Sequence, residues 1–174
     1  MLKNIAILVI VLLAALLAYA ATRPDAFRIE RSVSIKAAPE KVLALINDFH
    51  QWSRWSPWEK LDADLKRSYS GNAAGVGATY EWQGNKAGVG RMEIVESAAP
   101  ALVKIKLDFL KPMEAHNTAE FALKVQGDQT QVSWAMYGPS PFISKLMGIF
   151  FNIDKMVGKD FEAGLQTMKA LAEQ

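Results

Sequence analysis

The chain has 174 residues, which is enough for one globular domain and little more. Its 20 basic and 18 acidic side chains leave a net charge of +2, which excludes a nucleic-acid binder that works by neutralising many phosphates. The absence of cysteine excludes disulfides, thiolate catalysis and cysteine-ligated metal centres.

An uncharged apolar segment occupies residues 5–21, between Lys3 and Arg23. As a helix it would be about 25 Å long, slightly less than a bilayer hydrocarbon core of roughly 30 Å. We predict that residues 1–22 form a membrane anchor. The alternatives are a signal peptide, cleaved after the small-x-small pattern at residues 18–20, and a buried core helix.

The side of the membrane on which the rest of the chain lies is a separate question. More basic residues follow the apolar segment than precede it, which favours a cytoplasmic domain. Most of them, however, fall within a predicted strand that begins at Phe27, which weakens their influence on orientation. We predict a single-pass membrane protein whose domain lies on the extracytoplasmic side.

A short linker is predicted over residues 23–26, which include Pro24, and a globular domain over residues 27–174. Residues 27–36 alternate apolar and polar side chains, the pattern of a half-buried strand. Arg31 is the exception, because it falls on the apolar face. There it could bind the headgroup or carboxylate of a ligand, or pair with an acidic side chain of the protein.

A short amphipathic helix is predicted from Pro39, since proline suits the first turn and apolar residues then recur on one face as far as Ile46. Beyond it lie three of the five tryptophans: Trp52, Trp55 and Trp58. This cluster could cap a cavity entrance or enter a membrane interface. It could equally fix the short helices to the sheet.

Six more strands are predicted between residues 65 and 136, joined by short turns into an antiparallel meander. Asn117 falls on an inner face, where it could bind a ligand or satisfy a backbone group. The other inward positions include aromatic and methionine side chains that suit either an adaptable apolar pocket or a packed core. These are Tyr80, Trp82, Met92, Phe109, Phe121, Trp134 and Met136.

From Phe142 to Leu171 the apolar residues recur at every third or fourth position, which predicts one helix roughly 45 Å long. Residues 146–151 are apolar nearly all round. Such a segment could contact a ligand, a partner or the bilayer, with Phe150 as a candidate contact, or it could be buried in the domain. Because a sheet must cover its apolar face, we predict an α+β fold of about seven strands curved around this helix.

Five segments resemble a known family: ERSVSIKAAPEKV at 30–42, WSRWSPW at 52–58, VGRMEI at 89–94, FLKP at 109–112 and DKMVGKDFEAGL at 154–165. Over residues 27–174 the chain resembles the START-like (SRPBCC) superfamily of polyketide cyclase/dehydrase and lipid transport proteins. It is most similar to a bacterial subgroup with an N-terminal membrane helix. The resemblance implies the helix-grip fold and a deep cavity that holds a hydrophobic ligand.

No catalytic, metal-binding or cofactor-binding motif is recognised in the sequence. His116 and Glu120 lie four positions apart on one strand, roughly 13 Å from each other, and are expected to be solvated rather than to act as an acid–base pair. His50 could act as an acid near the cavity mouth, although a packing role is the simpler interpretation.

We therefore predict a membrane-tethered, non-enzymatic module, monomeric by default, that binds a hydrophobic small molecule or lipid. It would use no metal, cofactor or nucleic acid. The alternatives are a cyclase- or hydratase-type enzyme using Arg31, Asn117 or His50, and a regulatory partner of another membrane protein. The predicted ligand contacts are Arg31, Trp55, Trp58, Tyr80, Trp82, Met92, Phe109, Asn117, Trp134, Met136 and Phe150.

Overall fold

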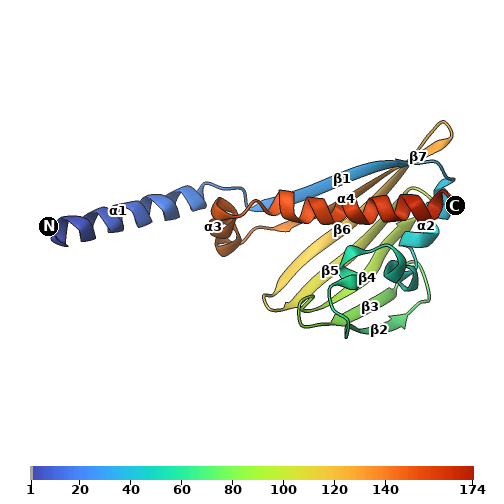
Figure 1. Cartoon of the computed structure of the whole chain (residues 1–174), viewed down its shortest axis with the longest axis horizontal. Helices are drawn as coiled ribbons and strands as arrows, with labels where there is room; N and C mark the ends of the chain where they lie inside the picture. The colour runs from blue at the N-terminus through green and yellow to red at the C-terminus, as the bar shows by residue number, and fades with distance from the viewer. Residues whose placement is uncertain (1) are drawn as a thin grey trace.

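The computed structural model describes residues 2–174 and begins with a helix that stands apart from the rest (Figure 1). This helix, α1 (Leu2–Ala21), has 20 residues and is therefore about 30 Å long. Its only buried residue is Ala20, at the end that joins the domain. Within residues 2–174 it is the one helix long and apolar enough to cross a membrane, a property that a signal sequence shares.

The domain is built on one seven-stranded antiparallel sheet with the spatial order β1-β7-β6-β5-β4-β3-β2. The first strand, β1, pairs with the last, β7, while the others follow one another as a meander. The strands are β1 (Ala26–Ile35), β2 (Lys66–Gly71), β3 (Ala78–Gln83), β4 (Val89–Ala98), β5 (Leu102–Lys111), β6 (Ala115–Gln126) and β7 (Gln129–Pro139). The predicted α+β class and the seven strands are confirmed.

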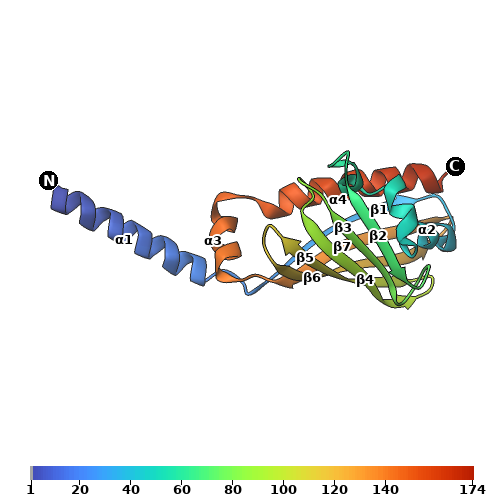
Figure 2. The same ribbon diagram turned by 90° about the horizontal axis from the view of Figure 1, so that it is seen from below.

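Short helices follow β1 and longer ones follow β7. They are α2 (Pro39–Ile46), the 3-10 helices η1 (Phe49–Arg54) and η2 (Pro57–Lys60), α3 (Phe142–Phe150) and α4 (Ile153–Ala172). The sheet curves around α4, which runs beside β1 along the length of the domain (Figures 1 and 2). This is the helix-grip arrangement.

The prediction of a single helix over residues 142–171 is wrong, because the chain breaks between α3 and α4. Phe151 adopts an extended conformation, and the side chain of Asn152 accepts a hydrogen bond from the backbone N–H of Lys155 at 2.9 Å, which begins α4. Asparagine is a strong helix-start residue. Apolar spacing alone does not reveal such a break, since apolar residues occur on both sides of it.

The core of the domain is rich in stacked aromatic rings. Trp134 lies parallel to Phe161 at 4.2 Å between ring centroids and stacks on Phe121 at 5.0 Å. Trp52 and Trp55 are buried beside them, and their indole N–H groups donate to backbone carbonyls at the end of α2, at 2.9 and 2.8 Å. These two tryptophans therefore fix the short helices to the sheet.

Candidate functional site

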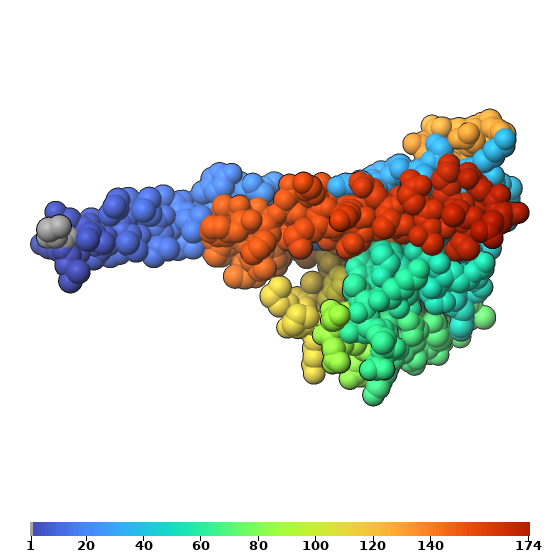
Figure 3. Space-filling model, viewed as in Figure 1, coloured from blue at the N-terminus to red at the C-terminus, as the bar shows by residue number. Residues whose placement is uncertain are grey.

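A cavity of about 170 Å³ lies between the sheet and the first half of α4. Figure 3 shows the surface hollowed beneath this part of α4. The lining is mostly apolar and comes from η1, η2, β3 to β7 and α4. Its apolar residues are Trp52, Trp58, Leu65, Trp82, Ala87, Met92, Leu107, Phe109, Ala119, Trp134, Met136, Val157 and Phe161.

The cavity lies in the half of the domain nearest to α1. Met136 pairs with Ile29 near the start of β1, and Phe109 and Trp82 lie near the ends of β5 and β3 at the same side of the sheet. Met136, Phe109 and Trp82 are only half-buried, as is Val157 in the second turn of α4. They form the rim of the cavity.

The size of the cavity limits what it can hold. A dry apolar cavity of about 150 Å³ is large enough for benzene, whereas drug-sized ligands occupy roughly 300–1,000 Å³. As it stands, the cavity accepts one ring or a short chain. Met92 and Met136 are flexible side chains whose rotation can enlarge it.

One side of the cavity is polar and consists of Ser56, Glu59 and Tyr80. The Glu59 side chain is only 6% exposed. Its Oε1 accepts a hydrogen bond from the Tyr80 hydroxyl at 2.5 Å, and its Oε2 accepts one from Arg67 Nε at 2.6 Å. A buried carboxylate is thus held by two donors, as burial of a charge requires.

The protonation of this polar side follows from its surroundings. Burial, and then the hydrogen bond to the Glu59 carboxylate, raise the pKa of the Tyr80 phenol far above its ordinary value, so Tyr80 remains a donor to Glu59. The hydrogen bond to Glu59 also raises the pKa of Arg67. The Ser56 side chain makes no helix-capping hydrogen bond. Spare lone pairs on these oxygens can accept hydrogen bonds from a bound molecule.

Trp134 contributes a hydrogen-bond donor to the cavity wall, in contrast to the acceptors of the polar side. Its Nε1–H is the one buried side-chain polar atom without a hydrogen-bond partner in the described part of the chain, and the residue lines the cavity. An unsatisfied buried donor costs about 1–3 kcal/mol. A hydrogen-bond acceptor carried by a ligand would remove this cost.

Sequence reasoning located much of the lining but missed Ser56 and Glu59 on its polar side. Among the predicted contacts, the cavity is lined by Trp58, Tyr80, Trp82, Met92, Phe109, Trp134 and Met136. Glu59 was missed because an acid between a tryptophan and a lysine resembles a surface residue. Its partner Arg67 lies eight positions away, with no motif that links the two.

The other predicted contacts lie outside the cavity lining. Trp55 is buried in the core, Phe150 is exposed on α3, and Asn117 lies beside Gly138, where its Oδ1 would be 2.3 Å from an added Cβ. Arg31 reaches α4 instead, with ion pairs of 2.9 Å to Asp154 and to Glu162. Its role in the structure is to hold α4 on β1.

The two histidines also lie away from the cavity. His50 accompanies Asp48 at 2.8 Å and stacks on the ring of Tyr69 at 4.2 Å. His116 is exposed to solvent, as expected, and its Nδ1 also lies 2.7 Å from Oδ1 of the buried Asp108 on the neighbouring strand. This hydrogen bond raises the pKa of His116 above its ordinary value.

Glu120 likewise has partners rather than only water. Its carboxylate accepts hydrogen bonds from Arg28 at 3.3 Å and from the Tyr137 hydroxyl at 3.2 Å. The sequence pattern could not show these contacts, because they join β6 to β7 beside it and to β1, which lies one strand further along the sheet.

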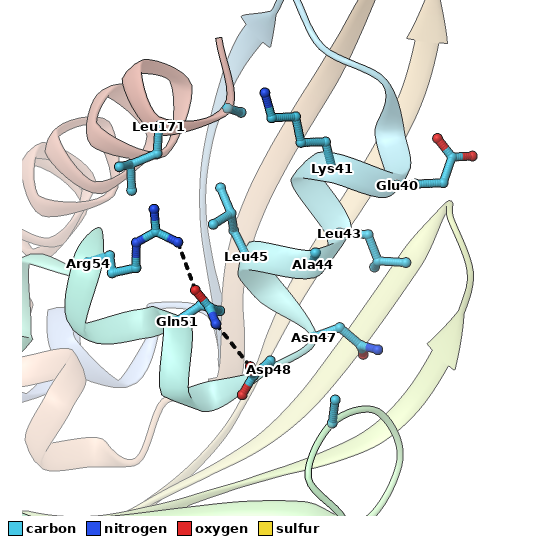
Figure 4. Close-up of a pocket in the computed structure, with 12 residues that line it drawn as sticks. Glu40, Lys41, Leu43, Ala44, Leu45, Asn47, Asp48, Gln51, Arg54 and Leu171 are labelled. Atoms are coloured by element: carbon cyan, nitrogen blue, oxygen red, sulfur yellow. Dashed lines mark hydrogen bonds between the residues drawn. The ribbon is translucent and has the colours of Figure 1, made fainter. Parts of the chain in front are cut away.

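A second depression, of about 560 Å³, lies at the opposite end of the domain between α2, η1 and the end of α4 (Figure 4). Gln51 bridges Arg54 and Asp48 there by hydrogen bonds of 2.9 and 3.2 Å. Although larger, it is a shallow surface groove with exposed charged residues such as Glu40 and Lys41. The enclosed cavity with its buried polar groups is the better candidate site.

A curved antiparallel sheet that grips a C-terminal helix around an apolar cavity defines a helix-grip domain. Residues 26–173 match the family model described as polyketide cyclase / dehydrase and lipid transport, and the chain belongs to this family. No curated protein sequence matches the chain.

Solved structures with the same fold share little sequence with it. Protein CV1439 from Chromobacterium violaceum has a TM-score of 0.62 and 16% identity, and the match covers 87% of this chain and 99% of that one. The Aha1 dimer from Colwellia psychrerythraea has a TM-score of 0.57 and 18% identity over 84% and 96%. SA2116 from Staphylococcus aureus has a TM-score of 0.61 and 15% identity over 86% and 96%.

Proposed function

We propose that this protein is a membrane-tethered module that binds a hydrophobic small molecule or lipid in the cavity between the sheet and α4. The observation that carries the proposal is a mainly aromatic and aliphatic cavity with a single buried polar side, formed by Ser56, Glu59 and Tyr80. Such a combination of apolar walls and a few fixed polar groups is typical of small-molecule sites. The family description, which includes lipid transport, agrees with it.

The polar side indicates what kind of molecule fits. An anionic group beside the Glu59 carboxylate would be repelled, whereas a hydroxyl can donate to Glu59 or to the Tyr80 oxygen. We therefore expect a ligand with an apolar ring or chain and a neutral hydrogen-bond donor at one end. The length and composition of α1 support a tether in the bilayer in which such molecules dissolve.

Native mass spectrometry of the full chain, expressed in bacterial membranes and extracted in mild detergent, tests the binding function. Ala119 is 4% exposed and lines the cavity, while Ala122 on the same strand faces solvent. We expect the protein to carry a small-molecule adduct that organic solvent releases. Ala119→Phe should lose the adduct because the ring fills the cavity, and Ala122→Phe should retain it.

Two outcomes would contradict the proposal. An adduct that survives Ala119→Phe would lie elsewhere than in the cavity, and the absence of any adduct in the unaltered chain would remove the binding role. The mass of the chain tests the tether separately: loss of the first 20 residues would mean that α1 is a cleaved signal peptide.

A catalytic role is the second candidate, and it rests on Glu59 and Tyr80 rather than on Arg31, Asn117 or His50. A carboxylate and a phenol joined at 2.5 Å beside an apolar cavity could act together on a bound substrate. If they do, Glu59→Gln should retain an adduct whose mass differs from the adduct of the unaltered protein, because the substrate would remain unconverted. Identical adduct masses would contradict catalysis and leave simple binding.

A further inference from the structure

The helix α3 is apolar on almost every side, yet none of its residues is buried in the domain. Its only polar side chains are Ser144 and Lys145. Large apolar side chains are exposed along it and directly after it; we refer to them as the apolar platform. The platform consists of Phe142, Ile143, Met147, Phe150, Phe151 and Ile153.

A helix of this composition needs an apolar environment. The domain leaves this surface uncovered: 66% of the surface of Phe150 is exposed. Ile143, Met147 and Phe150 follow one another at intervals of four and three residues, which places them on one stripe. The stripe is separate from Lys145, which turns toward the linker and pairs with Asp25.

The position of α3 indicates what supplies that environment. It contacts α1, and it lies across the long axis of the molecule while α1 lies along that axis (Figures 1 and 2). With a length of about 30 Å, α1 spans a hydrocarbon core of roughly the same thickness. A helix that crosses the end of a spanning helix then lies in the plane of the membrane surface.

We infer that α3 rests in the interface of the same bilayer that holds α1, with the apolar platform in contact with lipid. This inference rests on the tether of the proposed function. Amphipathic and apolar helices bind membrane surfaces in this orientation, and the spanning helix beside it removes most of the entropy cost of bringing α3 to the bilayer.

The platform also bears on access to the cavity. Val157 on the cavity rim follows the platform by four residues, in the second turn of α4. Phe109 and Met136 on the rim lie near the ends of strands that point to the same side of the domain. A docked α3 therefore turns the cavity mouth toward the membrane, so that a ligand exchanges with lipid rather than with water.

Spin labels on the full chain in vesicles of phosphatidylcholine and phosphatidylglycerol test the inference. The natural sequence has no cysteine, so each variant carries a single attachment site. Ile143→Cys and Phe150→Cys report on the platform, Leu12→Cys on α1, and Val125→Cys on an exposed position at the opposite end of the domain. Collisions with oxygen, which dissolves in lipid, are compared with collisions with a water-soluble nickel chelate.

We expect the ratio of oxygen to nickel collisions at positions 143 and 150 to exceed that at position 125 several-fold. Platform labels that match position 125 while the Leu12 label lies in lipid would overturn the inference and leave the tether intact. Platform labels shielded from both reagents would overturn it in favour of a protein partner. A Leu12 label in water would overturn the tether itself and the platform with it.

Discussion

Each of two buried acidic side chains in this domain is stabilised by its own hydrogen-bond donors. Glu59 is held by Tyr80 and Arg67, and Asp108 by His116 and Lys106. Burial pushes the pKa of Asp108 upward, but the hydrogen bonds from His116 and Lys106 outweigh it and keep the pKa below its usual value. The lowered pKa keeps the Asp108 carboxylate charged at neutral pH despite its burial.

The His116–Asp108 pair makes stability depend on pH in a defined direction. The raised pKa of His116 means that its stabilising charge is complete below the ordinary value of about 6.5 and is lost as the pH rises through the higher folded value. The lowered pKa of Asp108 means that its contribution is complete above about pH 3.9 and is lost as the pH falls through the lower folded value. The pair stabilises most between these limits.

We expect Asp108→Asn to lower the pKa of His116, as followed by NMR titration of the imidazole ring. The effect arises because the neutral amide no longer favours the imidazolium. Glu114→Gln is the matched control, since Glu114 also lies within 3.2 Å of His116 but is exposed and contributes less than Asp108. An equal or larger shift in the control would contradict the assignment.

At the scale of secondary-structure elements, the packing of α4 on β1 depends on a glycine. Gly158 is buried, and a Cβ there would lie 2.0 Å from Nη2 of Arg31, which passes beneath it to reach Asp154 and Glu162. The guanidinium also donates to the backbone carbonyl of Asp154 at 3.0 Å. One side chain of β1 thereby joins the first three turns of α4, and a Cβ at position 158 would require its guanidinium to move.

We expect Gly158→Ala to destabilise the domain in urea unfolding, although alanine ordinarily favours a helix interior by about 1 kcal/mol. The added methyl group would displace Arg31 from its acidic partners. Gly148→Ala on α3 is the control, because nothing lies within 4 Å of its added Cβ, and the ordinary gain in stability should appear there.

The second half of this test uses the double variant. In Arg31→Ala, the clash at position 158 no longer exists, so adding Gly158→Ala should cost little. If the two substitutions destabilise additively, Arg31 and Gly158 do not act through one another.

At this scale the sequence was informative where a pattern repeats. Alternation identified six of the seven strands, whereas β2 was predicted without it, and the inward residues that alternation selects supply much of the cavity wall. The break before α4 could not be predicted, because it depends on the single side chain of Asn152. The pairing of Arg31 with an acidic side chain was one of its two predicted roles, but its partners Asp154 and Glu162 could not be named, because they lie on another element. The same reason hid Glu59 and its partner Arg67.

For the whole molecule, the basic residues that follow α1 would influence its orientation in a membrane that it spans, as we propose. Arg28 pairs with Glu30 and Glu120, and Arg31 with Asp154 and Glu162. Charges that are paired within a folded domain differ from the free basic residues of short loops, on which the positive-inside rule rests. We therefore expect the domain to lie on the extracytoplasmic side.

A single-cysteine variant tests this orientation in intact cells. Val125→Cys is exposed at the far end of the domain and should react with a maleimide that cannot cross the cytoplasmic membrane. An Asn4→Cys variant, at the other end of α1, should react only after the cells are broken. The reverse pattern would place the domain in the cytoplasm.

The pairing of β1 with β7 has a consequence for the order in which the molecule is made. β1 emerges directly after α1, but its only neighbour in the sheet is the last strand to be synthesised. At about 5–20 residues per second, several seconds separate the two. During that interval β1 lacks its sheet partner. If α1 spans a bilayer as we propose, it enters the bilayer before the sheet can close, and the domain completes its folding on a chain already held at one end.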